Sequence, residues 1–309
     1  MIYWVLVFER SKASVVQVQL IIMKDSLKSS LVLMLKGFII GSSMSVPGVS
    51  GGTMAILLGI YDRLIGSISN FLKDIKGNTI FLMKVVIGAG IGIGSLAFAI
   101  KWLLEEFPFP VSFFFLGAVI GGIPALYKRT KTEGGSVRIS SGIYFLIGLV
   151  IVISIGFIPT GNIEISSGNG FVHYLMLLVT GIIIALALVL PGISTSHMLL
   201  ILGLYDSMLL AITEFDVIYI GILGVSTLIG IFIITKPLEW LMNKYTYQTY
   251  SMIIGFVLGS TSEIFRDKII PAIPSNAQMS WWISSVLFSA VTFILGYLGI
   301  ISLSKFSND

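Results

Sequence analysis

The stretch SVPGVSGGT, residues 45–53, interrupts an apolar run that begins near Leu31 and resumes in MAILLGIYD from Met54. It holds one proline, three glycines, two serines and a threonine. Proline removes a backbone donor, and glycine and the small hydroxyl residues are poor helix formers. The stretch therefore predicts a backbone break with many small polar groups inside an apolar segment.

The composition around this break is that of an integral membrane protein. Of 309 residues, 56% are hydrophobic and 11% are charged, and the mean hydropathy is +1.00, so a soluble domain would lack the surface charge that it needs. Apolar runs of about 17 to 25 residues recur, and no alternating barrel pattern is present, which predicts a polytopic all-α fold. The absence of cysteine excludes disulfides and Cys-ligated metal sites.

The broken segment occurs twice. An offset of 144 positions pairs residues 36–71 with residues 180–215, and 13 of the 36 positions are identical. The identities that apolar composition does not explain are Pro47 with Pro191, Gly48 with Gly192, Ser50 with Ser194, Gly59 with Gly203, Tyr61 with Tyr205 and Asp62 with Asp206. At an offset of 138 the match continues, pairing Trp102 with Trp240, Gly117 with Gly255 and Gly121 with Gly259. A duplicated fold with a broken helix at matching positions is typical of transporters.

Each half is expected to contain a broken hairpin followed by three membrane spans. After a cytoplasmic or interfacial leader over residues 1–30, the first repeat covers residues 31–160 and the second covers residues 173–305. The hairpins are predicted at residues 31–70 and 173–215, and the spans at residues 80–104, 111–127, 142–159, 217–235, 250–264 and 282–304.

The distribution of Lys and Arg predicts how the halves lie in the membrane, because cytoplasmic flanks are rich in them. The loop YKRTKTEGGSVR, residues 127–138, is placed inside, whereas the connector ITEFD, residues 212–216, carries neither Lys nor Arg and is placed outside. The second broken segment then returns to the side that it entered, so the repeat is inverted and the N-terminus is cytoplasmic. Each hairpin is either re-entrant or made of two complete spans, and we favour the re-entrant form because exposed non-helical backbone is tolerated only where protein or a water cavity surrounds it. Only FRDKIIPAIP, residues 265–274, with Arg266 and Lys268, disagrees.

The two tips, Pro47–Thr53 and Pro191–His197, are predicted to meet near the middle of the bilayer. A half-helix is expected to start after each Pro-Gly, with Ser50 and Ser194 as N-cap residues, and free N–H groups at helix starts bind anions, phosphate above all. The alternative is that these small residues only allow tight packing. The predicted phosphate-binding residues are Ser45, Pro47, Gly48, Ser50, Gly51, Gly52, Thr53, Arg63, Pro191, Gly192, Ser194, Thr195, Ser196 and His197.

Ionisable residues in apolar segments are functional candidates because they are costly in hydrocarbon. Asp62 and Asp206 repeat one another, and His197 is the intramembrane group whose ordinary pKa lies nearest neutrality. These three are predicted to couple transport to protons, with solvated or capping carboxylates as the alternative. Arg63 is predicted to pair with phosphate from the cytoplasmic side.

Enzyme signatures are missing from the chain. It has no His-Glu-x-x-His, Gly-x-Ser-x-Gly or Walker motif and no metal-ligand spacing, so we expect no metal, no cofactor, no catalytic residue and no nucleic-acid partner. The rival functions are a small-anion transporter and, less favoured, an intramembrane lipid phosphatase or hydrolase. The oligomeric state is left open, with a homodimer as one alternative.

At SVPGVSGGTMAILLGIYDRLI and LPGISTSHMLLILGLYD the chain resembles the bacterial polyprenyl-phosphate transporter family (PopT), over about residues 30 to 305. The first motif is complete, whereas Thr195 and His197 depart from the usual second motif. The resemblance implies a plasma-membrane flippase, not an enzyme, that returns undecaprenyl phosphate from the outer to the cytoplasmic leaflet for reuse in cell-wall synthesis. The isoprenoid tail would remain in lipid while the tips hold the phosphate.

Overall fold

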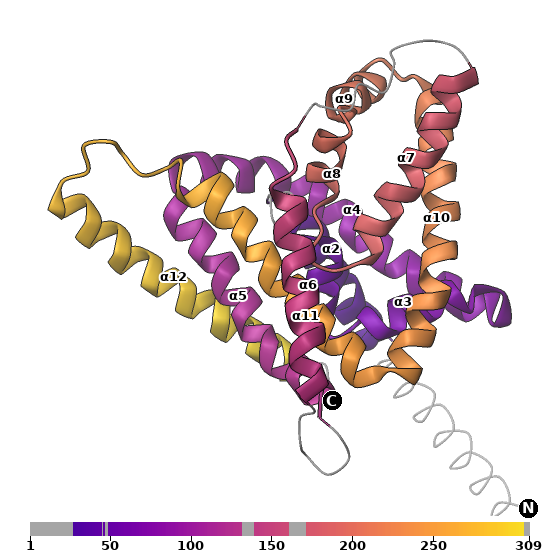
Figure 1. Ribbon diagram of the computed structural model, residues 1–309, viewed down its shortest axis with the longest axis horizontal. Helices are drawn as coiled ribbons and strands as arrows, with labels where there is room; N and C mark the ends of the chain where they lie inside the picture. Colours follow the sequence, from indigo (N-terminus) through magenta and orange to yellow (C-terminus); the bar gives the residue numbers. More distant parts are fainter. Residues whose placement is uncertain (1–26, 45, 47–48, 132–138, 161–170, 306–309) are drawn as a thin grey trace, which may run out of the picture.

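A computed structural model describes residues 27–44, 46, 49–131, 139–160 and 171–305 as a bundle of helices (Figure 1). The predicted leader and the tip residues Ser45, Pro47 and Gly48 lie wholly or largely outside this described part. A first helix covers residues 27–43. The others are α2 (Gly51–Leu57), α3 (Tyr61–Ser69), η1 (Phe71–Lys73), α4 (Ile75–Glu106), α5 (Pro108–Arg129), α6 (Ile139–Gly156), α7 (Phe171–Val189), α8 (Thr195–Ile201), α9 (Tyr205–Thr213), α10 (Val217–Lys244), α11 (Thr246–Ile264), η2 (Phe265–Ile269) and α12 (Met279–Lys305).

The helices of the two halves begin and end at matching positions. α2 and α8 have seven residues each, α3 and α9 have nine each, and both pairs keep the offset of 144 found in the sequence. Gly59 (φ 69°) and Gly203 (φ 66°) end α2 and α8 in the left-handed conformation. The following N–H groups, those of Ile60 and Leu204, donate to carbonyls five residues back at 2.9 Å, which is a Schellman cap in each half. The repeated Gly-x-Tyr-Asp is therefore a helix stop followed by a helix start.

Two pairs of long helices pack between the halves, whereas α10 packs along α7 within the second half. α5 lies along α12, and α11 lies along α6. Close approach requires glycine at the crossings: a Cβ on Gly117 would overlap the Phe293 carbonyl, and one on Gly255 would overlap the Phe145 carbonyl. The glycine pairs noted in the sequence are thus helix-packing positions, as small residues in membrane bundles commonly are.

The second hairpin can be followed in Figure 1. α7 descends from the upper edge to the middle of the molecule, the chain reverses at Pro191 and Gly192, and α8 ascends to α9 at the same upper edge. α2 lies near the centre, with α3 below it. The two short helices that follow the predicted breaks therefore lie in the interior of the bundle.

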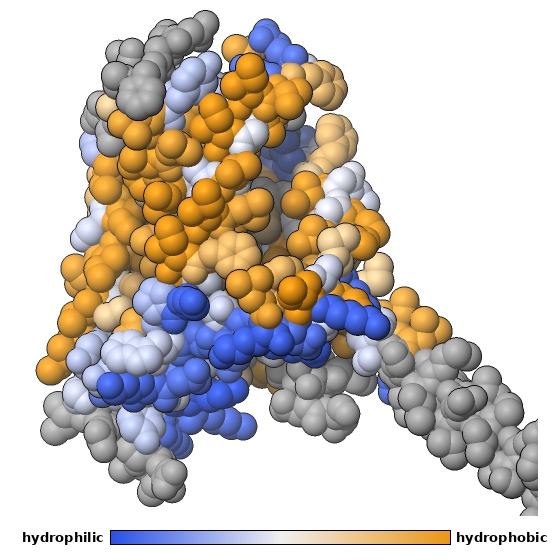
Figure 2. Space-filling model, turned by 90° about the vertical axis from the view of Figure 1, so that its right-hand side faces the viewer, coloured by the Kyte–Doolittle hydropathy of each residue, from blue (hydrophilic) through white to orange (hydrophobic). Residues whose placement is uncertain are grey.

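Four of the described helices are long and apolar enough to cross a membrane, namely α4, α5, α10 and α12. Figure 2 shows an apolar surface above a hydrophilic band, and α10 presents exposed Val225, Ile229 and Ile233. α11 has more polar residues than these four helices. It can carry them because most of it is enclosed by protein rather than facing outward. The predicted class, a polytopic helical membrane protein, is confirmed.

The two ends of the bundle differ in charge. α5 ends with Lys128 and Arg129 and α10 ends with Lys244 at the lower edge of Figure 1, which we call the basic end. α4 ends with Glu106, and Asp216 caps the start of α10, at the upper edge, which we call the acidic end. The α7–α8 hairpin opens toward the acidic end.

Candidate functional site

The two tips are joined by hydrogen bonds in the interior of the bundle. The Gly192 N–H donates to Ser50 Oγ at 3.0 Å and to Thr53 Oγ1 at 2.9 Å. The two hydroxyls also bond to each other at 2.8 Å, and Ser50 caps α2 by accepting from the Thr53 N–H at 3.1 Å. Ser50 is 5% exposed and Thr53 is fully buried. The hydroxyls of Ser50 and Thr53 are therefore occupied by the second tip.

A tyrosine of the repeated motif reinforces this joint. Tyr61, 2% exposed, donates its hydroxyl to the Val189 carbonyl at 2.7 Å, at the last residue of α7. Gly51 is half-buried, and a Cβ on the buried Gly52 would meet the Pro191 backbone at 3.3 Å. The predicted meeting of the tips thus brings Ser50, Thr53 and Gly192 within hydrogen-bond distance.

Gly192 holds the joint in a backbone conformation that only glycine adopts easily. Its φ is 83°, and a Cβ there would overlap the Phe256 carbonyl of α11. The positive φ and the close approach of Phe256 thus both restrict Gly192, the residue whose N–H donates to Ser50 and Thr53 of the first tip. The Pro-Gly motif is explained locally by this turn.

The second tip has the same sequence pattern but a different environment. Ser194 and Thr195 are half-buried, Ser196 is exposed, and only Leu199 and Ile201 of α8 are buried. Ser194 caps α8 by accepting from the His197 N–H at 3.4 Å. His197 is half-buried, yet its Nε2 is shielded and has no hydrogen-bond partner among the described residues. Ser196 is therefore accessible at the surface, in contrast to the buried Ser50 and Thr53 of the first tip.

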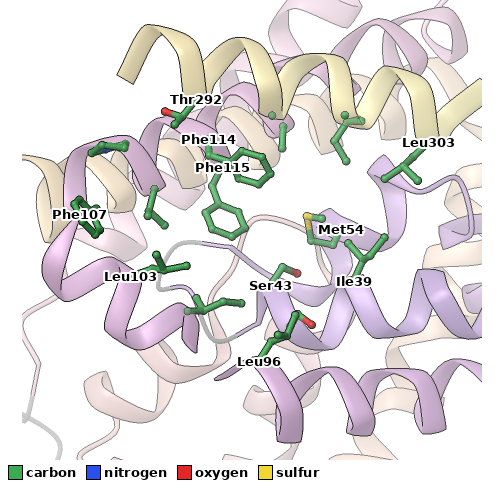
Figure 3. Close-up of a pocket in the computed structure, with 18 of the residues that line it drawn as sticks. Ile39, Ser43, Met54, Leu96, Leu103, Phe107, Phe114, Phe115, Thr292 and Leu303 are labelled. Carbon is green, nitrogen blue, oxygen red and sulfur yellow. The ribbon is translucent and has the colours of Figure 1, made fainter. Parts of the chain in front are cut away.

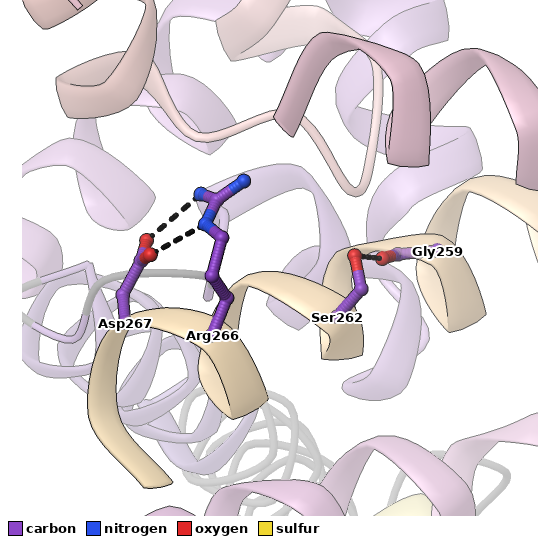
Figure 4. Close-up of polar contacts among 4 residues, drawn as sticks. All are labelled: Gly259, Ser262, Arg266 and Asp267. Carbon is purple, nitrogen blue, oxygen red and sulfur yellow. Dashed lines mark hydrogen bonds and ion pairs between the residues drawn. The ribbon is translucent and has the colours of Figure 1, made fainter. Parts of the chain in front are cut away.

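Charged residues at the end of α11 lie across from this second tip. Arg266 pairs with Asp267 through Nε to Oδ1 at 2.6 Å and through Nη2 to Oδ2 at 3.0 Å (Figure 4). One turn earlier lies Glu263, which is 2% exposed. The His197 ring lies against the Ile155 carbonyl and within electrostatic reach of Arg266 and Asp267. In Figure 4, Ser262 bonds to the Gly259 carbonyl of its own helix, so it adds no free group.

An apolar cavity of about 640 Å³ lies beside the first tip (Figure 3). Its walls come from the helix over residues 27–43 and from α2, α4, α5 and α12. The lining hydroxyls of Ser42, Ser43 and Thr292 donate to carbonyls of their own helices, so the cavity offers no free donor there. Phe107 and Phe288 line one end and are 49% and 66% exposed. The cavity is therefore not fully enclosed by protein.

The remaining predicted residues lie away from the joined tips. Asp62 accepts from the Tyr250 hydroxyl at 2.6 Å and pairs with Arg129 at 3.0 Å, at the basic end. Arg63 lies over the Phe81 ring, 4.3 Å from its centroid, and α2, about 10 Å of helix, separates it from Ser50. Asp206 is exposed in the first turn of α9. The structure does not bring these three side chains to the tips.

Sequence reasoning did not select Glu263 or Arg266. A signal for Arg266 was present, because its loop was the one segment that disagreed with the charge rule for orientation. Cations on the side that should lack them deserve a functional explanation. Glu263 lies within the predicted span over residues 250–264, so its charge in an apolar segment was a signal, and the structure adds that it is 2% exposed.

These features define a class: a helical membrane protein with two broken hairpins whose tips join in the interior beside an apolar cavity, an arrangement typical of membrane transporters. A family model described as VCA0040-like, undecaprenyl phosphate translocase-like, matches residues 40–280. The chain belongs to this family.

Two curated relatives agree with that family. The chain is 34% identical over 287 residues to the polyprenyl-phosphate transporter of Staphylococcus aureus, covering 89% of this chain and 96% of the relative. It is 29% identical over 265 residues to the polyprenyl-phosphate transporter of Vibrio cholerae, covering 81% and 80%. No solved structure matches.

Proposed function

We propose that this protein moves a polyprenyl phosphate, undecaprenyl phosphate in bacteria, unchanged from the outer to the cytoplasmic leaflet of the plasma membrane. The observation that carries the proposal is the apolar cavity beside the joined tips, since a phosphate with a long tail needs polar and apolar sites next to each other. The family and the two transporters similar to this chain support the same substrate class.

In this proposal the basic end faces the cytoplasm, because Lys and Arg are retained on that side. The halves over residues 31–160 and 173–305 form an inverted repeat, with re-entrant hairpins that enter from opposite faces. Matching helix bounds and the exchange of partners between α5–α12 and α11–α6 support a two-fold relation. Non-helical backbone at the tips is tolerated because protein encloses it.

The phosphate enters from the acidic end and is held at the second tip. Ser194, Thr195, Ser196 and His197 supply donors at the start of α8, and Arg266 supplies the charge. In this proposal the side chains contribute more to phosphate binding than the helix dipole does, because α8 has only seven residues. The first tip becomes available when Gly192 releases Ser50 and Thr53 and the path opens to the basic end.

Reconstitution in liposomes with undecaprenyl phosphate in one leaflet tests the function. Appearance of the unchanged lipid in the other leaflet is expected. Release of dephosphorylated lipid would indicate a phosphatase, and uptake of inorganic phosphate without lipid movement would indicate a small-anion transporter. Absence of transbilayer movement, with or without a pH gradient, would overturn the proposal.

The apolar cavity is proposed to hold part of the isoprenoid tail. Gly299 on α12 lines it, and a Cβ there meets nothing within 4 Å, so Gly299→Phe fills the cavity without a backbone clash. We expect the transport rate to fall about tenfold, equivalent to about 1.4 kcal/mol of lost tail binding. Gly224→Phe on α10 is the matched control, because its Cβ is also in open space and lies outside the cavity. Equal rates for both variants would contradict a tail site here.

A further inference from the structure

Glu263 is a buried carboxylate in the last turns of α11, and the proposed function does not use it. Only 2% of it is exposed, and no hydrogen bond or ion pair links its carboxylate to any of the described residues. A Cβ built on Gly156, at the end of α6, would lie 3.8 Å from Glu263 Cγ and 3.0 Å from Arg266 Nη1. At the position that corresponds in the first repeat, the chain has Ala125. The carboxylate is therefore specific to the half that forms the open tip.

The charged groups that act on Glu263 are Arg266 and Asp267, both on η2. His197, on α8, lies within electrostatic reach of the same two residues. The end of α6 contributes Gly156, whose Cβ would lie 3.8 Å from Glu263 Cγ, and α5 contributes Phe113, which packs against Phe265, so neither of these contacts adds a titratable group. Arg266 already holds Asp267 with two hydrogen bonds. Glu263 and Asp267 thus both lie near the guanidinium of Arg266, and Asp267 accepts the two hydrogen bonds from it.

A second negative charge near Arg266 makes an ionised Glu263 unfavourable. An ionised carboxylate is costly to bury without a partner of its own. A phosphate that approaches Arg266 and His197 adds further negative charge in surroundings where water screens little, and like charges repel strongly there. A proton on the Glu263 carboxylate removes this repulsion. Head-group binding and protonation of Glu263 then favour each other, and the effect is reciprocal.

We propose that Glu263 takes up one proton when the phosphate head group of the lipid approaches Arg266 and His197, and releases it after the head group has left. This inference rests on the proposed transport of polyprenyl phosphate and names the residue that couples it to protons. It replaces Asp62 in that role, because Asp62 is already paired with Arg129 and bonded to Tyr250.

Transport measured against the pH on the acidic-end side tests the proposal. The useful range is about pH 7.5 to 9, because the phosphate itself is already fully ionised above its second pKa near 6. Over that range we expect the wild-type initial rate to fall by up to about tenfold per pH unit. Glu263→Gln, which is neutral at every pH, should change by less than about twofold. Glu106→Gln is the control, because it removes an exposed carboxylate at the same end. Its transport rate should depend on pH as that of the wild type does.

The possible outcomes separate the two proposals. Wild-type protein that moves no lipid at any pH removes the proposed function. Lipid movement with the same pH profile in wild type and Glu263→Gln removes only the role of Glu263.

A second measurement uses the wild-type protein alone, so that it does not depend on the folding of a variant. Geranyl phosphate is titrated into detergent-solubilised protein at about pH 8 in two buffers of different ionisation enthalpy, which reports the protons exchanged on binding. Uptake of about one proton per ligand is expected from the linkage. Binding without proton uptake would overturn the proposal.

Discussion

The first and second tips share Pro-Gly, a capping serine and a seven-residue helix that ends in a left-handed glycine, yet protein covers one and leaves the other accessible. Six of the seven residues of α2 are buried, against two of α8. α2 packs on α5, whereas the main contacts of α8 are with α7 and α9. In the proposed transport cycle, these unequal surroundings correspond to an arrangement that is accessible from the acidic end.

Cysteine accessibility gives the largest expected contrast between the tips. The chain has no cysteine, so single substitutions report one position each. Ser196→Cys is exposed, and Thr53→Cys replaces a fully buried residue. We expect a water-soluble maleimide to label the first at least on the order of a hundredfold faster, since labelling of the second requires opening of the bundle. Equal rates would show that the difference in burial does not persist in the membrane.

Gly192→Ala should have the largest effect on stability. The substitution places a side chain at a positive φ and against the Phe256 carbonyl, at a cost of roughly 3 kcal/mol or more from the backbone conformation and the clash together. Thermal unfolding in detergent measures the loss. Gly224→Ala on α10, where a Cβ meets no atom within 4 Å, is the control and should unfold near the wild-type temperature.

The capping serines give a smaller test of the same comparison. Ser50→Ala removes a helix cap and leaves the buried Gly192 N–H with one acceptor fewer, so about 2 kcal/mol of stability should be lost. Ser194→Ala removes only a 3.4 Å cap at a half-buried position and should cost about 0.5 to 1 kcal/mol. Chemical or thermal unfolding of the two variants side by side decides this, and a larger loss for Ser194→Ala would contradict it.

Much of the fold follows from the sequence, because membrane spans and helix breaks depend on local composition. Apolar length predicted the helices, and Pro47 to Thr53 predicted the break, since neither signal requires knowledge of distant contacts. The pairing of Gly192 with Ser50 and Thr53 was not predictable in detail. It depends on how far each of two hairpins, distant in the sequence, extends into the bundle.

The candidate site was predicted less completely than the fold. Repetition selected the tip residues, but it gave equal weight to Asp62 and Asp206, which lie away from the tips, one paired and the other exposed. It also passed over Glu263, which has no repeated counterpart. Sequence symmetry finds the residues that the halves share and passes over a residue that only one half has.

The exchange of helix partners between the halves has a consequence for biosynthesis. α5 packs along α12, yet α5 enters the membrane while residues 130–278 are still to be added. Until α12 arrives, the groove at Gly117 that receives the Phe293 backbone faces lipid or a membrane chaperone. The first half is thus inserted early but assembled late, and the cell must protect an unfinished bundle for much of its synthesis.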